Sequence, residues 1–398
     1  MISKLTNKEI KPFMTFGKMP IANGFLNKED FEKEFFFEMK VGFCEDLSLF
    51  QILEHPKPEM MFNEKYPFYT SSSNFMINHF KLYADWIKKK YLKNSKKLIE
   101  IGSNDGTFLK NFENVDIETI GFEPSKNVSD VANKQGINSI CQFFNQNNLL
   151  NLNKYKNTID VICAANVICH IPDLKDLFKT VDYCLSKNGV FIFEEPYLGS
   201  MFNKISYDQI YDEHIYIFSA TAINNICKLF DLELIDIIAQ ETHGGSMRYV
   251  CGRKKVHEIN PIVNKKIEEE DKNELNIIKS CLKFKSDCEK SKKNLRDKIS
   301  NIKEKNKKIC GYAATSKSTT ILNYCDIGTD SIDFICDTTK EKIGKYSPGK
   351  HIPIKEMDYF YNNIPDVAFL FAWNHKKEIF KKEKKFSENG EWIAHVEL

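Results

Sequence analysis

The sequence has no marked excess of charge of either sign and no long apolar run. Its 57 Lys and Arg residues nearly balance 55 Asp and Glu residues, so the formal net charge of 398 residues is only +2. Such a balance provides no global basic surface for nucleic acid. No apolar segment approaches the roughly 20 residues that cross a bilayer, and residues 1–12 lack the apolar core of a signal peptide. We therefore expect a cytoplasmic protein without a nucleic acid or membrane partner.

The twelve cysteines lack the spacing of a metal or redox site. No two of them form a C-x-x-C pair, and most lie in apolar stretches such as 160–169. Reduced, buried thiols in a cytosolic chain are the simplest interpretation of this pattern. We accordingly expect no bound metal.

Segment 95–255 alternates between apolar strands and helical stretches. Predicted strands lie at 98–101, 117–122, 158–164 and 189–193, and helical stretches between them at 128–135 and 174–185. Alternation at this spacing predicts an α/β, Rossmann-like core in which helices cover both faces of a parallel sheet.

Two further regions flank this core. Residues 1–94 are rich in aromatic residues and predict a small N-terminal lobe with a helix that leads into the core. Segment 256–398 begins with a charged stretch, 261–308, whose single apolar stripe predicts one or two long surface helices, a coiled coil being the alternative. A second strand–helix alternation follows and predicts a second, smaller Rossmann-like domain.

A turn rich in small and polar residues follows the first core strand. It reads Gly-Ser-Asn-Asp-Gly over 102–106, is preceded by Glu100, and is followed 21 residues after Gly102 by Glu123 at the end of the next strand. A carboxylate there can accept hydrogen bonds from two ribose hydroxyls, as in dinucleotide enzymes. The G-x-G-x-x-G pattern that cradles a pyrophosphate is missing, however, and acidic side chains suit a cationic sulfonium and an amino group better. We predict that the turn binds S-adenosylmethionine through Glu100, Gly102, Asn104, Asp105, Gly106 and Glu123, an ordinary strand–helix turn being the alternative.

Two later stretches carry polar residues at the same edge of the predicted sheet. Asn166 and His170 follow an apolar strand, and we expect Asn166 to reach the cofactor. Tyr211, Glu213 and His214 then lie within four residues, which brings together the groups of general acid–base chemistry. His can take up a proton near neutral pH because its ordinary pKa is about 6.5. A polar surface loop is the alternative interpretation.

Taken together, these motifs resemble the sugar C-methyltransferases that build branched deoxysugars. The resemblance covers nearly the whole chain and rests on several motifs in one order: residues 16–23, 100–108, 165–172, 195–197, 210–214, 243–248, 311–317, Asp337, 350–353 and 372–374. It implies an N-terminal zinc-binding lobe, a methyltransferase core and a C-terminal Rossmann-like domain. It also implies methyl transfer to ring carbon 3 of a nucleotide-linked 4-keto sugar through an enolate.

The resemblance further implies roles for individual residues. His214 is the expected base with Tyr211 beside it, Glu213 orients the base or a sugar hydroxyl, and His170 holds the oxygen on carbon 4. The expected substrate contacts are Tyr66 or Tyr69 in the first lobe, His243 and Arg248 in the core, and Lys317 near the phosphates. An O- or N-methyltransferase and a non-catalytic protein that binds a sugar nucleotide are the alternatives. We expect a monomer or a homodimer.

One departure from the family concerns zinc. The family's lobe uses two cysteine pairs, but residues 1–10 hold no cysteine and Cys44 is followed by Glu45, Asp46 and Leu47. A single thiolate cannot supply the four ligands of a structural zinc site. We therefore expect apolar packing in place of the metal.

Overall fold

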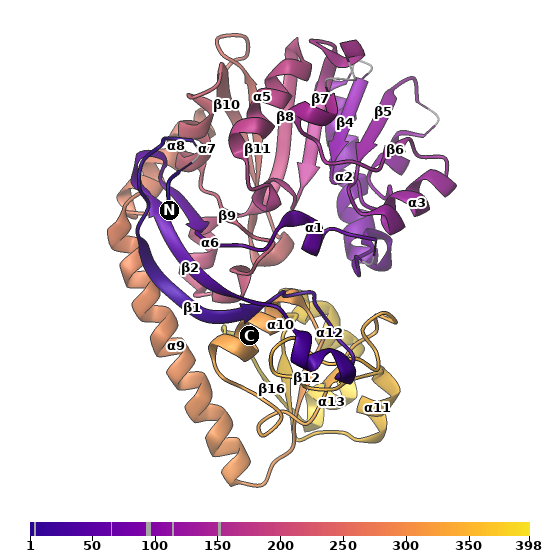
Figure 1. The fold of residues 1–398 in the computed structure, drawn as a ribbon, viewed down its shortest axis with the longest axis vertical. Coiled ribbons are helices and arrows are strands. Elements are labelled where there is room, and N and C mark those ends of the chain that lie inside the picture. The colour runs from indigo at the N-terminus through magenta and orange to yellow at the C-terminus, as the bar shows by residue number, and fades with distance from the viewer. Residues whose placement is uncertain (4, 65, 93–96, 114, 150–152) are drawn as a thin grey trace.

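Three β-sheets organise the chain in the computed structural model (Figure 1). The structure describes residues 1–398 except 4, 65, 93–96, 114 and 150–152. The boundary that we expect between residues 94 and 95 lies outside the described residues. Among the described helices, none is both long and apolar enough to cross a membrane.

The central sheet has seven strands in the order β10-β11-β8-β7-β4-β5-β6. Its bounds are β4 Lys97–Ile101, β5 Glu118–Phe122, β6 Ser139–Ile140, β7 Ile159–Ala165, β8 Leu185–Pro196, β10 Leu232–Gln240 and β11 Ser246–Arg253. The strands from β8 to β6 pair in parallel, whereas β11 pairs antiparallel with both β8 and β10. The predicted α/β class is confirmed, and strand β11, which runs antiparallel to both of its neighbours near one edge, is an addition that the sequence pattern did not indicate.

Helices cover both faces of this sheet because its strands alternate their side chains. In β7, Ile162 and Ala164 pack into one core with α5 and α7, whereas Val161 and Cys163 pack into another core with α2. A residue period of two sends neighbouring side chains to opposite faces, and apolar residues on both faces then require cover on both. The helices of this region are α2 Asn74–Tyr91, α3 Lys126–Lys134, α4 Gln146–Leu149, α5 Leu174–Cys184, α6 Leu198–Lys204 and α7 Ala220–Cys227.

The first 52 residues form most of an antiparallel sheet of four strands. Its order is β1-β2-β3-β9, with β1 Pro12–Pro20, β2 Phe36–Cys44, β3 Leu49–Ile52 and β9 Tyr216–Ile217. Because β9 comes from the core, the N-terminal segment is joined to the core by strand pairing. A short helix, α1 Pro58–Met61, then leads toward α2.

The C-terminal region forms a parallel sheet of five strands, β14-β13-β12-β15-β16. Its elements are β12 Ile309–Tyr312, α10 Ser316–Tyr324, β13 Ile335–Cys336, β14 Ile354–Lys355, α11 Met357–Asn362, β15 Val367–Leu370, α12 Lys376–Lys382, α13 Lys384–Asn389 and β16 Glu391–Ile393. A parallel sheet with helices agrees with the second alternation seen in the sequence.

Two helices connect the core to this region. They are α8 Pro261–Lys272 and α9 Ile278–Glu304, and α9 runs along one side of the molecule past β1 and β2 (Figure 1). The apolar stripe of α9 packs against β1 in the same core cluster, and Phe284 stacks on Phe202 with ring centroids 4.5 Å apart. The stripe therefore serves packing against a sheet and α6, and the coiled-coil alternative is wrong for this helix.

Candidate functional site

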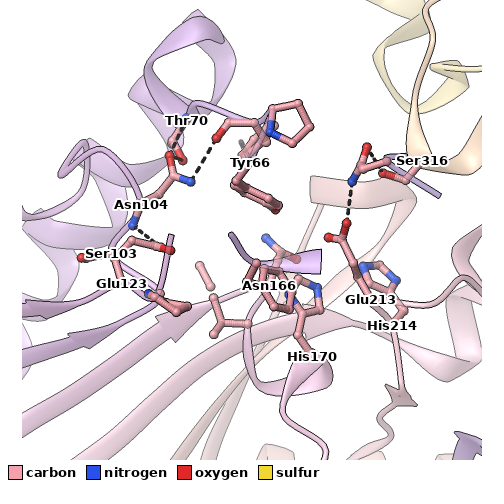
Figure 2. A pocket seen from close by; sticks show the side chains of 18 of the residues that line it. Tyr66, Thr70, Ser103, Asn104, Glu123, Asn166, His170, Glu213, His214 and Ser316 are labelled. Atoms are coloured by element: carbon pink, nitrogen blue, oxygen red, sulfur yellow. Dashed lines mark hydrogen bonds between the residues drawn. The ribbon is translucent and has the colours of Figure 1, made fainter. Parts of the chain in front are cut away.

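A cavity of about 870 Å³ lies where all three regions meet. It runs from the turn after β4, past the ends of β7 and the loop that holds His214, to the start of α10 in the C-terminal region. In Figure 2, Asn104 and Glu123 lie on one side of this space, Glu213, His214 and Ser316 on the other, and Asn166 and His170 between them. One continuous cavity thus joins the predicted cofactor turn to the predicted acid–base residues.

The turn after β4 brings its backbone close to the neighbouring strand. Gly102 has a φ of +68°, and a Cβ at this position would lie 2.4 Å from a methyl carbon of Val167. Only glycine fits here without displacing Val167. Gly102 lines the cavity together with Glu100, Asn104, Glu123 and Asn166.

Glu123 is held in place by two backbone amides. Asn104 N donates to Glu123 Oε2 at 3.0 Å, and Ser125 N donates to Oε1 at 2.7 Å. Burial raises the pKa of Glu123, while these donors oppose the rise. Each carboxylate oxygen keeps a lone pair for a ligand hydroxyl, because an ionised carboxylate has about four acceptor positions.

The side chain of Asn104 forms hydrogen bonds with the N-terminal region. Its Oδ1 accepts from Thr70 N at 3.0 Å and from the Thr70 hydroxyl at 3.2 Å, and its Nδ2 donates to Phe68 O at 3.2 Å. Figure 2 shows this contact beside Tyr66. The side chain therefore fastens the segment before α2 over the cofactor turn.

The acidic side chains of this turn fit S-adenosylmethionine. Glu100 is buried, its Oε2 has no hydrogen-bond partner among the described residues, and burial together with Asp105 and Glu123 raises the pKa of its carboxyl well above the ordinary value. A buried acceptor without a partner is costly unless a ligand satisfies it. The ammonium group of the cofactor supplies such a donor, and its ribose hydroxyls match Glu123.

His214 and Tyr211 form a hydrogen-bonded pair at the other end of the cavity. Tyr211 Oη lies 2.6 Å from His214 Nε2, and His214 Nδ1 lies 2.8 Å from the carbonyl oxygen of Gln209. Because a carbonyl oxygen can only accept, Nδ1 carries the proton and the lone pair of Nε2 accepts from the Tyr211 hydroxyl. Burial lowers the pKa of His214 well below its ordinary value, so the ring is neutral at pH 7.

His170 lies next to this pair. Its ring stacks on His214 with centroids 5.3 Å apart and on Phe62 at 5.6 Å. Its Nε2 is buried and has no hydrogen-bond partner among the described residues, and burial lowers its pKa to about 3. When Nε2 carries the single proton of the neutral ring, it is a donor available to an oxygen atom in the cavity.

Glu213 directly precedes His214 and lines the cavity. Its Oε1 accepts from Asn23 Nδ2 at 2.6 Å, and Asn23 Oδ1 accepts from the Ser316 hydroxyl at 3.0 Å. Burial raises the pKa of Glu213 to about 7, whereas Asn23, Lys342 and Tyr66 oppose the rise. Near neutral pH this group therefore exists in both protonation states.

Two lysines lie at the C-terminal end of the cavity. Lys317, in the first turn of α10, lies beside Asn374 at 3.4 Å, and burial lowers its pKa while Asp208 opposes this. Lys342 Nζ donates to Ala314 O at 2.8 Å, and burial lowers its pKa while Asp337 and Glu213 oppose this. Both line the cavity, as does His243.

Sequence reasoning missed several residues of this site. Asn23 and Asp337 were seen within motifs without a role, and Lys342 was not singled out. Asp337 could have been recognised, because it follows the second strand of its domain as Glu123 follows the second strand of the core. Its carboxylate accepts from Ala314 N in the turn after β12, at 2.6 Å, and from Thr339 N, at 2.7 Å.

Four predicted site residues do not line the cavity. Arg248 is buried against α2: its Nε donates to Glu194 Oε1 at 2.7 Å, and its guanidinium lies 3.9 Å from the ring centroid of Tyr83. Strand pairing places Arg248 opposite Glu194, so it stabilises the sheet and α2. Its predicted substrate contact has no support in this geometry.

The other three serve the loops around the site. Tyr69 Oη accepts from Asn127 Nδ2 at 2.9 Å, which leaves Tyr66 as the tyrosine of this segment that faces the cavity. Asp105 Oδ2 accepts from Ser71 N at 2.9 Å, and a Cβ on Gly106 would contact Ile137 at 3.0 Å. Their role is to shape the turn and to fasten the segment above it.

One group of potential metal ligands occurs among the described residues, namely Cys169, His170 and His214, with donor atoms within 4.8 Å of one another. Both ring nitrogens of His214 already take part in hydrogen bonds. With its Nδ1 protonated and its Nε2 accepting, His214 has no free lone pair for a metal. In the N-terminal region, Cys44 is buried in an apolar core with Ile10, Leu47, Leu49 and Leu53.

Three family models match consecutive parts of the chain. A putative zinc binding domain matches residues 6–62, a methyltransferase domain matches residues 76–237, and a C-methyltransferase C-terminal domain matches residues 241–396. The first match contains a single cysteine, Cys44. The similarity therefore extends to the lobe's sequence without the cysteines that a zinc site needs.

Individual relatives agree with these matches. The C-methyltransferase NovU of Streptomyces niveus is 28% identical over 383 residues, which cover 95% of this chain and 90% of that protein. Among solved structures, an S-adenosylmethionine-dependent methyltransferase from Clostridium acetobutylicum is 18% identical, with a TM-score of 0.35 over 44% of this chain and 92% of that chain. A possible histamine N-methyltransferase from Thermotoga maritima is 20% identical, with a TM-score of 0.36 over 46% of this chain and 93% of that chain. The two structural likenesses do not bear on the acceptor of the methyl group.

The order of domains along the chain and the relative that spans nearly all of it point to one conclusion. The chain is similar to C-methyltransferases over nearly its whole length, and it is an S-adenosylmethionine-dependent methyltransferase.

Proposed function

We propose that the methyl acceptor is a nucleotide-linked 4-keto sugar and that the methyl group is transferred to ring carbon 3 through an enolate. The observation that carries this proposal is the Tyr211–His214 pair, buried in the same cavity as Glu100 and Glu123. Carbon–carbon bond formation needs a carbon nucleophile, and a base next to the methyl donor is the means of making one. When bound, S-adenosylmethionine supplies an electrophilic methyl group.

The base in this proposal is His214, acting through Nε2. A ketone on carbon 4 acidifies the proton on carbon 3, so a neutral imidazole of moderate strength suffices once the developing oxyanion is stabilised. Because the lone pair of Nε2 accepts from the Tyr211 hydroxyl in the resting state, the proton from carbon 3 reaches Nε2 in this proposal either after that hydroxyl turns away or through it, the phenol passing its own proton to Nε2 as it takes one from the substrate. The Gln209 carbonyl keeps the proton on Nδ1, which reserves Nε2 for proton uptake.

The oxyanion in this proposal is held by His170. Its unpartnered Nε2 lies in the buried wall of the cavity, and its lowered pKa keeps the ring neutral. A neutral imidazole N–H can polarise a carbonyl and then stabilise the enolate oxygen. Glu213 accepts a sugar hydroxyl or balances the positive charge that His214 gains on proton uptake.

The C-terminal end of the cavity suits the diphosphate of the nucleotide. Lys317 and Lys342 provide two cationic side chains, and the backbone amides in the first turn of α10 provide partial positive charge. Tyr66 and His243 complete the sugar site from two other regions of the chain. The cavity thus offers basic groups where phosphates would lie and neutral groups where the ring would lie.

Hydrogen exchange tests the enolate directly. A panel of nucleotide-linked 4-keto sugars is incubated in D2O with the enzyme and S-adenosylhomocysteine, which cannot donate a methyl group, and NMR follows the proton on carbon 3. We expect enzyme-dependent loss of this signal for the true substrate. When S-adenosylmethionine replaces S-adenosylhomocysteine, we expect a new bond between carbon 3 and the methyl group. Methyl transfer to an oxygen or nitrogen atom without exchange would contradict the proposal.

A further inference from the structure

Asn23 lies where three distant parts of the chain meet. It follows β1, it donates from Nδ2 to Glu213 Oε1 at 2.6 Å, and it accepts at Oδ1 from the hydroxyl of Ser316, the first residue of α10, at 3.0 Å. Asn23, Glu213 and Ser316 all line the cavity. A single side-chain amide therefore joins the N-terminal region, the acid–base loop and the C-terminal region at the site itself. Figure 2 shows its two partners, Glu213 and Ser316, on the same side of the cavity.

The two partners fix the orientation of this amide. An ionised carboxylate can only accept, so in that state Nδ2 must face Glu213, and Oδ1 then faces the Ser316 hydroxyl. Rotation of the amide by half a turn would place Oδ1 against the carboxylate and would leave Glu213 without its short hydrogen bond. The Ser316 hydroxyl adds a second hydrogen bond, which restrains the amide in the orientation that Glu213 selects.

Glu213 has few other groups that balance its charge. Its own loop contributes Asp212, which repels it, and Tyr211. Lys342, in the loop after β13, attracts it, and Tyr66, before α2, donates to it. Cys169, after β7, and His214, the next residue in the loop, are further titratable groups near it. Asn23 provides the strongest opposition to the effect of burial, ahead of Lys342 and Tyr66.

We propose that Asn23 is a positioning residue that holds the ionised carboxylate of Glu213 in one orientation toward the cavity. Its backbone neighbour strengthens this role, because Ala22 N donates to Asp212 Oδ1 at 3.0 Å and the Thr319 hydroxyl donates to Ala22 O at 2.8 Å. Residues 22 and 23 are thus anchored on both sides. The catalytic meaning of an oriented Glu213 rests on the function proposed above.

A titration of Glu213 tests the inference without any substrate. The full-length enzyme is labelled with ¹³C at glutamate carboxyl groups, and the Glu213 signal is identified by its loss in Glu213→Gln. In Asn23→Ala we expect the midpoint to move to higher pH by about one to two units, because a hydrogen bond to a charged group is lost. Asn27→Ala, a change of an exposed residue in the same region, should leave the midpoint in place.

A second variant keeps the test valid if Asn23→Ala does not fold. Ser316→Ala leaves Nδ2 present but frees the amide to rotate, so we expect a smaller shift in the same direction. An unchanged midpoint in both variants would overturn the inference, as would a shift equal to that of Asn27→Ala.

A rate measurement separates positioning from simple stabilisation. In Asn23→Ala, kcat for methyl transfer should fall by about tenfold or more, and the acid limb of its pH profile should move with the Glu213 midpoint. The affinity for S-adenosylmethionine should stay within about twofold, because Asn23 does not touch Glu100 or Glu123. A shifted titration with unchanged kcat and pH profile would overturn the positioning role. If the wild type failed to act on any keto sugar while the titration shifted as expected, the proposed substrate would be wrong and the orientation of Glu213 by Asn23 would stand.

Discussion

The hydroxyl of Tyr211 donates to Nε2 of His214 across 2.6 Å, in a site where burial raises the pKa of the phenol and lowers that of the imidazole. Both shifts favour the neutral forms, so the shared proton stays on the tyrosine in the resting state. The pair therefore presents a neutral base next to the cavity at neutral pH. Which of the two atoms receives a proton from a substrate is open to direct test.

Replacement of His214 should remove the base. In His214→Asn we expect methyl transfer and exchange at carbon 3 to fall together by about 100- to 10,000-fold, with S-adenosylmethionine binding nearly unchanged. Tyr211→Phe is the matched variant, since it keeps Nε2 and removes only the hydroxyl. Exchange that survives in His214→Asn and disappears in Tyr211→Phe would identify Tyr211 as the base.

Removal of the carboxylate at Glu123 should weaken cofactor binding. A charge-assisted hydrogen bond contributes about 1.5–3 kcal/mol, so Glu123→Ala should reduce the affinity for S-adenosylmethionine by about 10- to 150-fold. Isothermal titration calorimetry provides the measurement. Glu118→Ala, at the exposed start of the same strand, is the control. Equal affinities of Glu123→Ala and wild type would refute the ribose contact.

Loss of Lys317 should weaken binding of the sugar nucleotide. We expect Lys317→Ala to raise KM for the nucleotide sugar by about tenfold, the effect of about 1.4 kcal/mol, and to leave the KM for S-adenosylmethionine unchanged. Lys340→Ala changes an exposed lysine of the same region that does not line the cavity. A phosphate role for Lys317 is excluded if both variants behave as the wild type.

The purified enzyme should contain no structural zinc. Cys44 is the single cysteine of the lobe, and its thiol is packed among aliphatic side chains. Elemental analysis should give far less than one zinc per chain, and treatment with a chelator should leave the unfolding temperature unchanged. A stoichiometric amount of zinc that resists dialysis would contradict this expectation.

Buried histidine makes stability depend on acidity. The folded-state pKa of His170 is lowered to about 3, whereas the unfolded chain binds this proton below about pH 6.5. The unfolded state then binds more protons, so His170 reduces stability as the pH falls from 6.5 toward 3. Phenylalanine does not titrate, so His170→Phe escapes this loss. We expect its free energy of unfolding to gain about 1–2 kcal/mol relative to wild type as the pH falls from 6.5 to 5.

Denaturant unfolding at several pH values measures this difference. The comparison between variant and wild type is essential, because Glu195 and Glu213 act in the opposite direction. Burial raises the pKa of each to about 7, so the folded state holds their protons between about pH 4.3 and 7. A difference between variant and wild type that stays constant across this pH range would contradict the burial of His170.

The sequence predicted the parts of the fold that depend on local pattern. Strands β4, β5, β7 and β8 are short apolar runs between helices, and this pattern identifies buried parallel strands. Strand β10 was missed because Glu233 and Asp236 interrupt its apolar residues. In the structure, Asp236 forms an ion pair with Lys90 of α2.

The same distinction applies to the site. Glu100, Glu123 and His214 were predicted because they follow strands or lie within compact polar motifs. Arg248 shares a motif with His243, but it lies within β11, where its side chain pairs with Glu194 and packs against Tyr83 of α2. The role of Asn23 was out of reach, because its partner Glu213 lies 190 residues away along the chain.

The partners of residues 22 and 23 are synthesised much later than these residues themselves. Residues 22 and 23 leave the ribosome early, yet their partners at Glu213, Ser316 and Thr319 follow 190 to 297 residues later. At about 5–20 residues per second, this separation leaves the early segment waiting for tens of seconds. We therefore expect a nascent chain to complete the cofactor turn before its C-terminal region reaches the cavity, so that methyl transfer becomes possible only after that last contact forms.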